Sequence, residues 1–191
     1  MKRRTLVVTV LLGAAISACA QPTLTTPEYA VAIEEATDAY IAESQTLSAT
    51  FQGTVEDEVI RIVETGSDDP LTEATDMTRR ETVLYLALLE DAMGRYVERL
   101  SAMHPPGELE GVHAEYVDAV EVVHSALPST RSSVLSAGSL DEIKEALAGS
   151  GFQDGQYRLT STCLSLEGSV RAEGTGVVLG CTRPPVLDVG P

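Results

Sequence analysis

Two pairs of residues in the middle of the chain have the spacing of metal ligands on a helix. Glu110 with His113, and Glu121 with His124, form Glu-x-x-His motifs, and this spacing places both side chains of a pair on one helix face. The motifs are offset by 11 residues, or about 16 Å along a helix, so they cannot share one metal centre. Each would need further carboxylates from a neighbouring helix. A metal-binding protein using His113 or His124 with Glu residues is therefore the alternative hypothesis, and no metal ligand is assigned.

The chain also contains candidate soft metal ligands, namely Met77, Met93 and Met103 together with His104. Thioether and imidazole groups together suit copper. The methionines follow the apolar stripe of a predicted helix, however, and core packing explains them better. The sequence lacks the motifs GxSxG, SxxK, HExxH, GxGxxG and the P-loop, which removes the usual sequence support for hydrolases and nucleotide-binding proteins. We assign no catalytic residue and no cofactor, and we predict a non-catalytic role.

The N-terminus has the three regions of an export signal. Residues 1–4 are basic apart from Met1, residues 6–16 are mostly apolar, and the small residues Ser17 and Ala18 follow. This order is typical of a cleaved leader. The apolar run is shorter than the roughly 20 residues of a membrane-spanning helix. We predict a signal peptide over residues 1–18.

The segment Ile16-Ser17-Ala18-Cys19 resembles the lipobox of bacterial lipoproteins. The resemblance implies that Cys19 receives a diacylglyceryl thioether and, after cleavage before it, becomes an acylated N-terminus carrying fatty acids such as palmitate. Several acyl chains suit stable anchoring, since one chain holds a protein only marginally. Residues 19–26 would then be the lipidated Cys and a tether, on the extracytoplasmic face of a cell membrane or outer membrane. An ordinary secretory signal cleaved near Ala20 is the alternative.

With Cys19 assigned to lipid, Cys163 and Cys181 remain as an even pair in an oxidising compartment. A helix predicted at 155–172 carries the first, and an apolar stretch at 177–179 runs back toward it. Ten helical residues rise about 15 Å, which the returning segment can cover when extended. We predict a disulfide that stabilises the fold by roughly 3 kcal/mol. Two free thiols or a metal pair are the competing hypothesis.

Apolar residues recur at steps of three and four through most of the chain, which indicates amphipathic helices. The segment 100–109, with His113 and Tyr116 after it, is similar to helix–Pro-Pro–helix segments of uncharacterised exported helical proteins of bacteria. That resemblance implies a fold and no activity. The predicted helices run from Thr26 to the turn at 66–70 with a break or kink at Gly53, from 71 to 103, from 108 to a stop at Pro128, from 139 to 148, and from 155 to 172.

The chain is strongly acidic, with 29 Asp and Glu against 13 Lys and Arg among 191 residues. Removal of the leader cations Lys2, Arg3 and Arg4 would leave ten cations. Nucleic acid is therefore not expected as a partner, because its binding depends on clustered basic side chains. We predict an all-α fold: an antiparallel helical bundle at 27–183 with a short disulfide-tied extended segment, and a tail at 184–191. The predicted role is lipid-anchored binding of a small ligand or an envelope protein.

Overall fold

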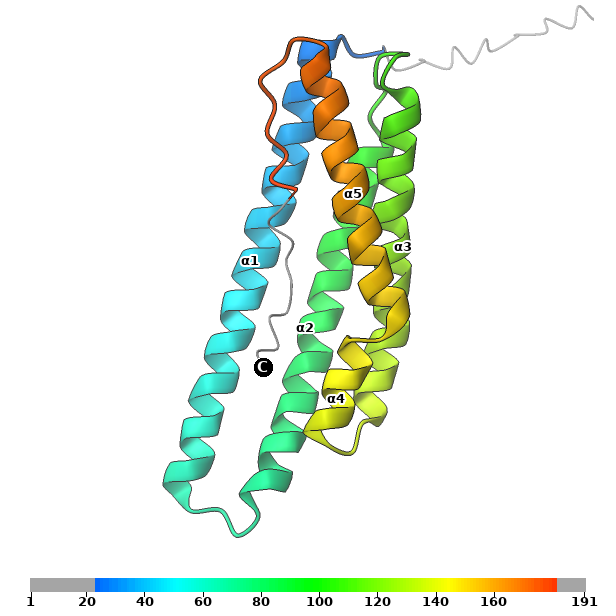
Figure 1. Cartoon of the computed structure of the whole chain (residues 1–191). Helices are drawn as coiled ribbons and strands as arrows, with labels where there is room; N and C mark the ends of the chain where they lie inside the picture. The colour runs from blue at the N-terminus through cyan, green and yellow to red at the C-terminus, as the bar shows by residue number, and fades with distance from the viewer. Residues whose placement is uncertain (1–22, 182–191) are drawn as a thin grey trace, which may run out of the picture.

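The computed structural model describes residues 23–181, and all regular structure in this range is helical (Figure 1). The all-α prediction is therefore confirmed. The signal peptide, the lipidation of Cys19 and the tail at 184–191 lie outside the described residues. The helices are α1 (Thr26–Thr65), α2 (Pro70–Ser101), α3 (Glu110–Ser136), α4 (Leu140–Leu147) and α5 (Ser150–Ala172).

The long helices form an antiparallel bundle in which each one packs on its neighbour in sequence. α1 packs on α2, α2 on α3, and α3 on α5, while the short α4 lies against α3 and α2 (Figure 1). α1 and α5, by contrast, have little direct contact with each other. The core is continuous from α1 to the C-terminal segment and includes Tyr29, Ile33, Leu86, Leu100, Val120, Leu127, Leu166 and Leu179, each fully buried.

α1 begins at the predicted residue, Thr26, and the residue before it caps the helix. The backbone nitrogen of Thr25 donates a hydrogen bond to Oε2 of Glu28 at 2.9 Å, and its hydroxyl donates to the same atom at 2.7 Å. These bonds lower the pKa of the exposed Glu28 carboxyl. The predicted break at Gly53 is wrong, because α1 runs through it for 40 residues in all. A single glycine costs a helix about 1 kcal/mol, which neighbouring turns readily offset.

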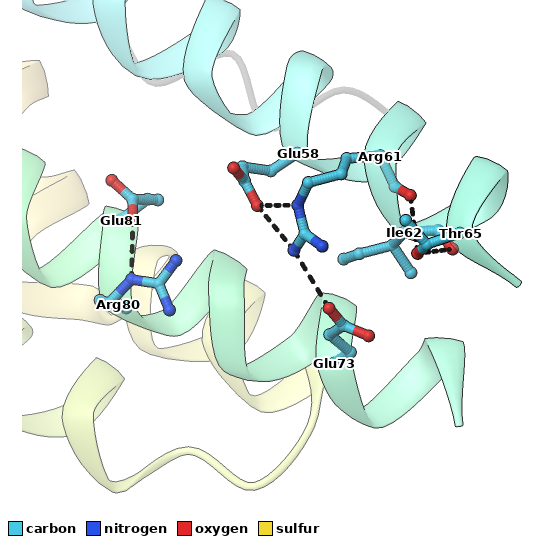
Figure 2. Close-up of polar contacts among 7 residues, drawn as sticks. All are labelled: Glu58, Arg61, Ile62, Thr65, Glu73, Arg80 and Glu81. Carbon is cyan, nitrogen blue, oxygen red and sulfur yellow. Dashed lines mark hydrogen bonds and ion pairs between the residues drawn. The ribbon is translucent and has the colours of Figure 1, made fainter. Parts of the chain in front are cut away.

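The turn between α1 and α2 is framed by exposed polar contacts (Figure 2). Arg61 donates to Glu58 at 2.9 Å on its own helix and to Glu73 of α2 at 3.0 Å. Asp69 caps α2 by accepting a hydrogen bond from the backbone nitrogen of Thr72. Exposed ion pairs of this kind contribute little stability. They lie at the end of the bundle farthest from the N-terminus of α1.

Two predicted helix limits are wrong because burial overrides the local signal. α3 continues through Pro128 to Ser136. An internal proline costs about 3 kcal/mol. The turns that follow it bury Val134 fully, which offsets about 1.5–3 kcal/mol of this cost. α5 begins before Gly155, at Ser150. At Gly155, α5 packs closely against α3, since a Cβ there would lie 3.1 Å from Cγ2 of Val123.

Candidate functional site

The C-terminal strap, residues 174–181, leaves the end of α5 and runs back alongside α1 (Figure 1). Its Val177 and Leu179 side chains are buried in the core. The backbone nitrogen of Leu179 donates to Glu167 of α5 at 2.8 Å, and that of Val178 donates to Glu34 of α1 at 3.3 Å. The strap therefore joins two helices that hardly meet directly.

A disulfide ties the end of the strap to α5. Cys163 and Cys181 are bonded, with their Cα atoms 5.5 Å apart, which confirms the predicted pairing. The residue before Cys181 must be glycine, because Gly180 has a positive φ of 63° and a Cβ there would lie 3.0 Å from Cδ1 of Ile41. The chain thus turns tightly against α1 before it reaches the disulfide.

A half-enclosed cavity of about 50 Å³ lies between the strap and the four long helices. The disulfide and Leu179 form one side of it. None of the residues that line it carries a charged side chain. Its apolar wall consists mainly of Ile41, Leu89, Met93, Val123, Phe152 and Leu159.

Tyr40 is one of the residues that line the cavity, but its hydroxyl oxygen is fully buried and has no hydrogen-bond partner within the described part of the chain. Tyr40 is 5% exposed, and its ring stacks on that of Tyr96 with centroids 4.7 Å apart. Burial raises the pKa of this phenol, and the nearby Tyr85 and Tyr116 raise it further. Tyr40 is therefore held neutral and rigid, with one polar atom unsatisfied.

The other buried hydroxyls around the cavity are paired in a network. The Thr37 hydroxyl donates to the carbonyl oxygen of Ile33 at 2.7 Å and lies 2.9 Å from the hydroxyl of Tyr96. The Tyr96 hydroxyl in turn lies 2.7 Å from that of Tyr116. Burial is the main reason that the pKa values of Tyr96 and Tyr116 are raised. The network is neutral throughout.

His113 belongs to this buried polar core. Its Nε2 lies 3.2 Å from the carbonyl oxygen of Leu100, and its Nδ1 lies 2.8 Å from the hydroxyl of Tyr29. A carbonyl can only accept, so Nε2 must carry the proton and Tyr29 must donate to Nδ1. Burial lowers the pKa of His113, against a smaller opposing effect of the Leu100 carbonyl. Both ring nitrogens are thus engaged in the neutral form.

Acidification should destabilise the protein through His113. The pKa of His113 is lowered in the folded state. At a pH above its ordinary pKa of about 6.5, His113 is neutral in both the folded and the unfolded protein, and its contribution to stability is complete. As the pH falls below that value, the unfolded chain takes up the proton first and stability is lost. Urea unfolding between about pH 7.5 and about pH 5.5 should show this loss, in the range where His titrates.

The matched comparison for the pH experiment is His113→Gln against His124→Gln. The first variant should have a smaller pH dependence of unfolding than the wild type, because the buried titrating group is gone. The second variant keeps His113 and should therefore keep the pH dependence that His113 causes. Equal pH dependence in wild type and His113→Gln would contradict the assignment.

The other residues singled out in the sequence do not converge. Glu110 and Glu121 are exposed, and His124 lies beside Gly94 of α2, where an added Cβ would be 3.4 Å from its Nε2. Met77 and Met93 are both buried, but their positions on α2 differ by about 24 Å in helix rise. Within residues 23–181, no group of three or more His, Cys, Asp or Glu side chains is placed to hold a metal ion.

No role is assigned to any tyrosine from the sequence, so Tyr40 is found only in the structure. The sequence does place several tyrosines on helix faces that are predicted to be buried. A buried tyrosine usually finds a partner for its hydroxyl, so these positions indicate a buried polar network. Tyr29 and Tyr40 share the stripe of α1, and Tyr96 and Tyr116 face them from α2 and α3. Periodicity alone could not show which hydroxyl would be left unpaired.

The chain matches no family model, no curated protein and no solved structure. Among the helices of the described residues, none is both long and apolar enough to cross a membrane. The class of protein that the structure defines is a disulfide-closed antiparallel helical bundle with a half-enclosed apolar cavity.

Proposed function

We propose that this protein is lipid-anchored on the extracytoplasmic face of a bacterial membrane and that its helical bundle is a non-catalytic binding domain. The observation that carries the anchoring is the Ile16-Ser17-Ala18-Cys19 sequence after a basic and apolar leader. The disulfide between Cys163 and Cys181 supports export, because such bonds persist in oxidising compartments.

The position of α1 relative to Cys19 supports display close to a membrane. α1 begins at Thr26, so the intervening residues span at most about 25 Å when extended. α1 itself has 40 residues and is therefore about 60 Å long. An anchor at Cys19 would hold the end of the bundle that contains the start of α1 near the lipid and place the α1–α2 turn far from it.

The cavity supports ligand binding as the role of the bundle. Ligand sites are concave and mostly apolar, with a few polar groups that orient the bound molecule. The cavity at the strap is mostly apolar, and the polar residues Gln156 and Thr160 are among those that line it. The buried hydroxyls around it are neutral and paired, which favours a binding role over proton-transfer chemistry.

Cys19→Ser should abolish incorporation of an alkyne-labelled palmitate and leave the leader attached. The thioether needs the Cys19 sulfur, and cleavage of lipoprotein leaders follows lipid attachment in the class that the motif resembles. Labelling in growing cells followed by intact-mass analysis measures both effects.

Cys163→Ser is the control for the labelling experiment, since it removes a cysteine but leaves Cys19, and it should label as well as the wild type. Labelled Cys19→Ser protein would contradict the proposal. Unlabelled wild-type protein cleaved near Ala20 would instead support the ordinary secretory signal.

A further inference from the structure

We propose that the exposed face of α2 binds a second copy of this chain, with the two α2 helices parallel and related by a two-fold axis that runs along them. The parallel orientation rests on the proposed lipid anchor, whereas the contact face itself does not. Three features of α2 carry the inference: exposed leucines, apolar grooves on both sides of them, and opposite charges at the two edges of the face.

Two large apolar side chains are exposed in the middle of α2. Leu84 is 54% exposed and Leu88 is 43% exposed, and their spacing of four residues places them one turn apart on the same side of the helix. Leu86 and Leu89, which point to the opposite side, are buried in the core. Single exposed leucines are normal, but adjacent ones that form a patch mark an interaction surface.

The patch continues into a groove on each side of the exposed leucines. Leu84 and Leu88 line the groove toward α1 together with Leu47 and Phe51. The groove toward α3 is lined by Leu84 and by the further apolar residues Val83, Ala87, Pro128 and Leu135. The leucines of a second copy therefore have apolar grooves to enter, as packing between helices requires.

Opposite charges lie at the two edges of this face. Arg80 lines the groove toward α3, whereas the next residue, Glu81, lines the groove toward α1, and the two side chains bond to each other at 2.9 Å (Figure 2). Glu98 and Arg99 follow 18 residues later, which is about five helical turns, so they project at the same two edges. Both are exposed.

A two-fold axis parallel to α2 makes these charges complementary. Rotation by half a turn about that axis exchanges the two edges and keeps each residue at its own level. Arg80 of one copy then faces Glu81 of the other, and Glu98 faces Arg99. Opposite charges that face each other across an interface select the partner and its orientation.

The proposed anchor favours the parallel arrangement. An antiparallel pair would place the starts of the two α1 helices at opposite ends, and α1 has 40 residues, or about 60 Å. The tether from Cys19 to Thr26 spans at most about 25 Å, so two upright copies anchored in one membrane must point the same way. Confinement to one membrane also raises their local concentration.

A membrane surface fits this face less well than a second copy does. The face carries the acidic residues Glu81, Asp91 and Glu98, and anionic headgroups would repel them. Arg95, which also follows the leucines, already pairs with Glu43 of α1. A second copy instead supplies both signs of charge at matching levels.

The test is disulfide crosslinking of the full chain in membranes of the cells that produce it. Leu84→Cys and Leu88→Cys should each give a dimer under a mild oxidant, because each position faces its own copy across the axis. Leu164→Cys is the matched control, since Leu164 of α5 is 48% exposed but lies on another helix, and it should stay monomeric. The wild type should also stay monomeric, because its Cys163 and Cys181 are bonded to each other.

A charge exchange tests the edges of the face. Adding Arg80→Glu to the Leu84→Cys chain places acids opposite each other and should lower the crosslinked fraction at least about fivefold. Adding Glu81→Arg as well restores opposite signs and should restore the crosslink. Exposed ion pairs contribute little stability, so these chains should fold.

The absence of dimers at both leucine positions, equal crosslinking of Leu164→Cys, or no recovery in the charge-exchanged chain would overturn the proposal. A dimer formed only between a Leu84→Cys chain and a Leu88→Cys chain would also overturn it, because that result indicates an antiparallel pair. The palmitate label on Cys19 is measured separately. A chain that crosslinks without the label would refute the anchor and leave the contact face, so the two failures are distinguishable.

Discussion

Replacing Cys163 and Cys181 together with serine should lower the free energy of unfolding by about 3 kcal/mol. The bond closes a loop with a sequence separation of 18 residues, and its removal frees that loop in the unfolded chain. It also loosens the strap, whose remaining attachments include the backbone hydrogen bonds of Val178 and Leu179 to glutamates, the hydrogen bond from Arg171 to the Val177 carbonyl oxygen, and the burial of Val177 and Leu179. Urea unfolding of variant and wild type measures the loss.

Hydrogen exchange locates the effect of the missing disulfide. The amides of Val178 and Leu179 should exchange much faster in the double variant, while those in the paired middle of α1 and α2 should follow global stability alone. Reductant added to the wild type is the control and should reproduce the variant. Unchanged unfolding and unchanged strap exchange would contradict the role that we assign to the bond.

The same double variant should also lose the cavity beneath the strap. Leu179, Gly180 and Cys181 form part of the cavity wall, and a released strap cannot maintain it. The disulfide therefore links the stability of the fold to the shape of the cavity.

Tyr96→Phe should destabilise the fold by about 1–3 kcal/mol, although it removes a single oxygen atom. The Tyr96 hydroxyl lies between those of Thr37 and Tyr116. Thr37 keeps its bond to the Ile33 carbonyl, but the buried Tyr116 hydroxyl would lose the partner that Tyr96 provides. Since Tyr116 also has a side-chain hydrogen bond with Thr37, the cost comes from the two hydrogen bonds that the buried network loses.

Tyr85→Phe provides the matched comparison for stability, because it removes a buried hydroxyl without a hydrogen-bond partner in the described residues. Burial raises the pKa of Tyr85 to about 12, so the group is neutral and no charge is lost. Its unfolding free energy should stay within about 0.5 kcal/mol of the wild type. Equal losses in Tyr85→Phe and Tyr96→Phe would show that the network has no special role.

The sequence by itself determined the helical class and the cysteine pairing. Steps of three and four between apolar residues identify each long helix, because the period is a property of one helix and needs no knowledge of its neighbours. The pairing of Cys163 with Cys181 followed from the small number of cysteines and from the reach of a short returning segment.

Helix limits were predictable only where the local signal and the core agree. Local chemistry predicts that a helix ends at Pro128 and that another begins at Gly155, yet both residues lie inside helices. At Pro128, burial of the following turns offsets the free-energy cost of the lost backbone hydrogen bond. At the second, the small residue is required by close contact with Val123. Such effects depend on the neighbouring helix, which local periodicity does not specify.

Only the tertiary structure decided where a binding site could lie. The cavity joins residues from Thr37 to Cys181, and it exists because α1 and α5 hardly meet and the strap fills part of the gap between them. The unpaired state of the Tyr40 hydroxyl is equally a tertiary property. The spacing of apolar residues in the sequence indicates which face of a helix is buried. The hydrogen-bond partner of each buried polar atom depends instead on the side chains of the neighbouring helix.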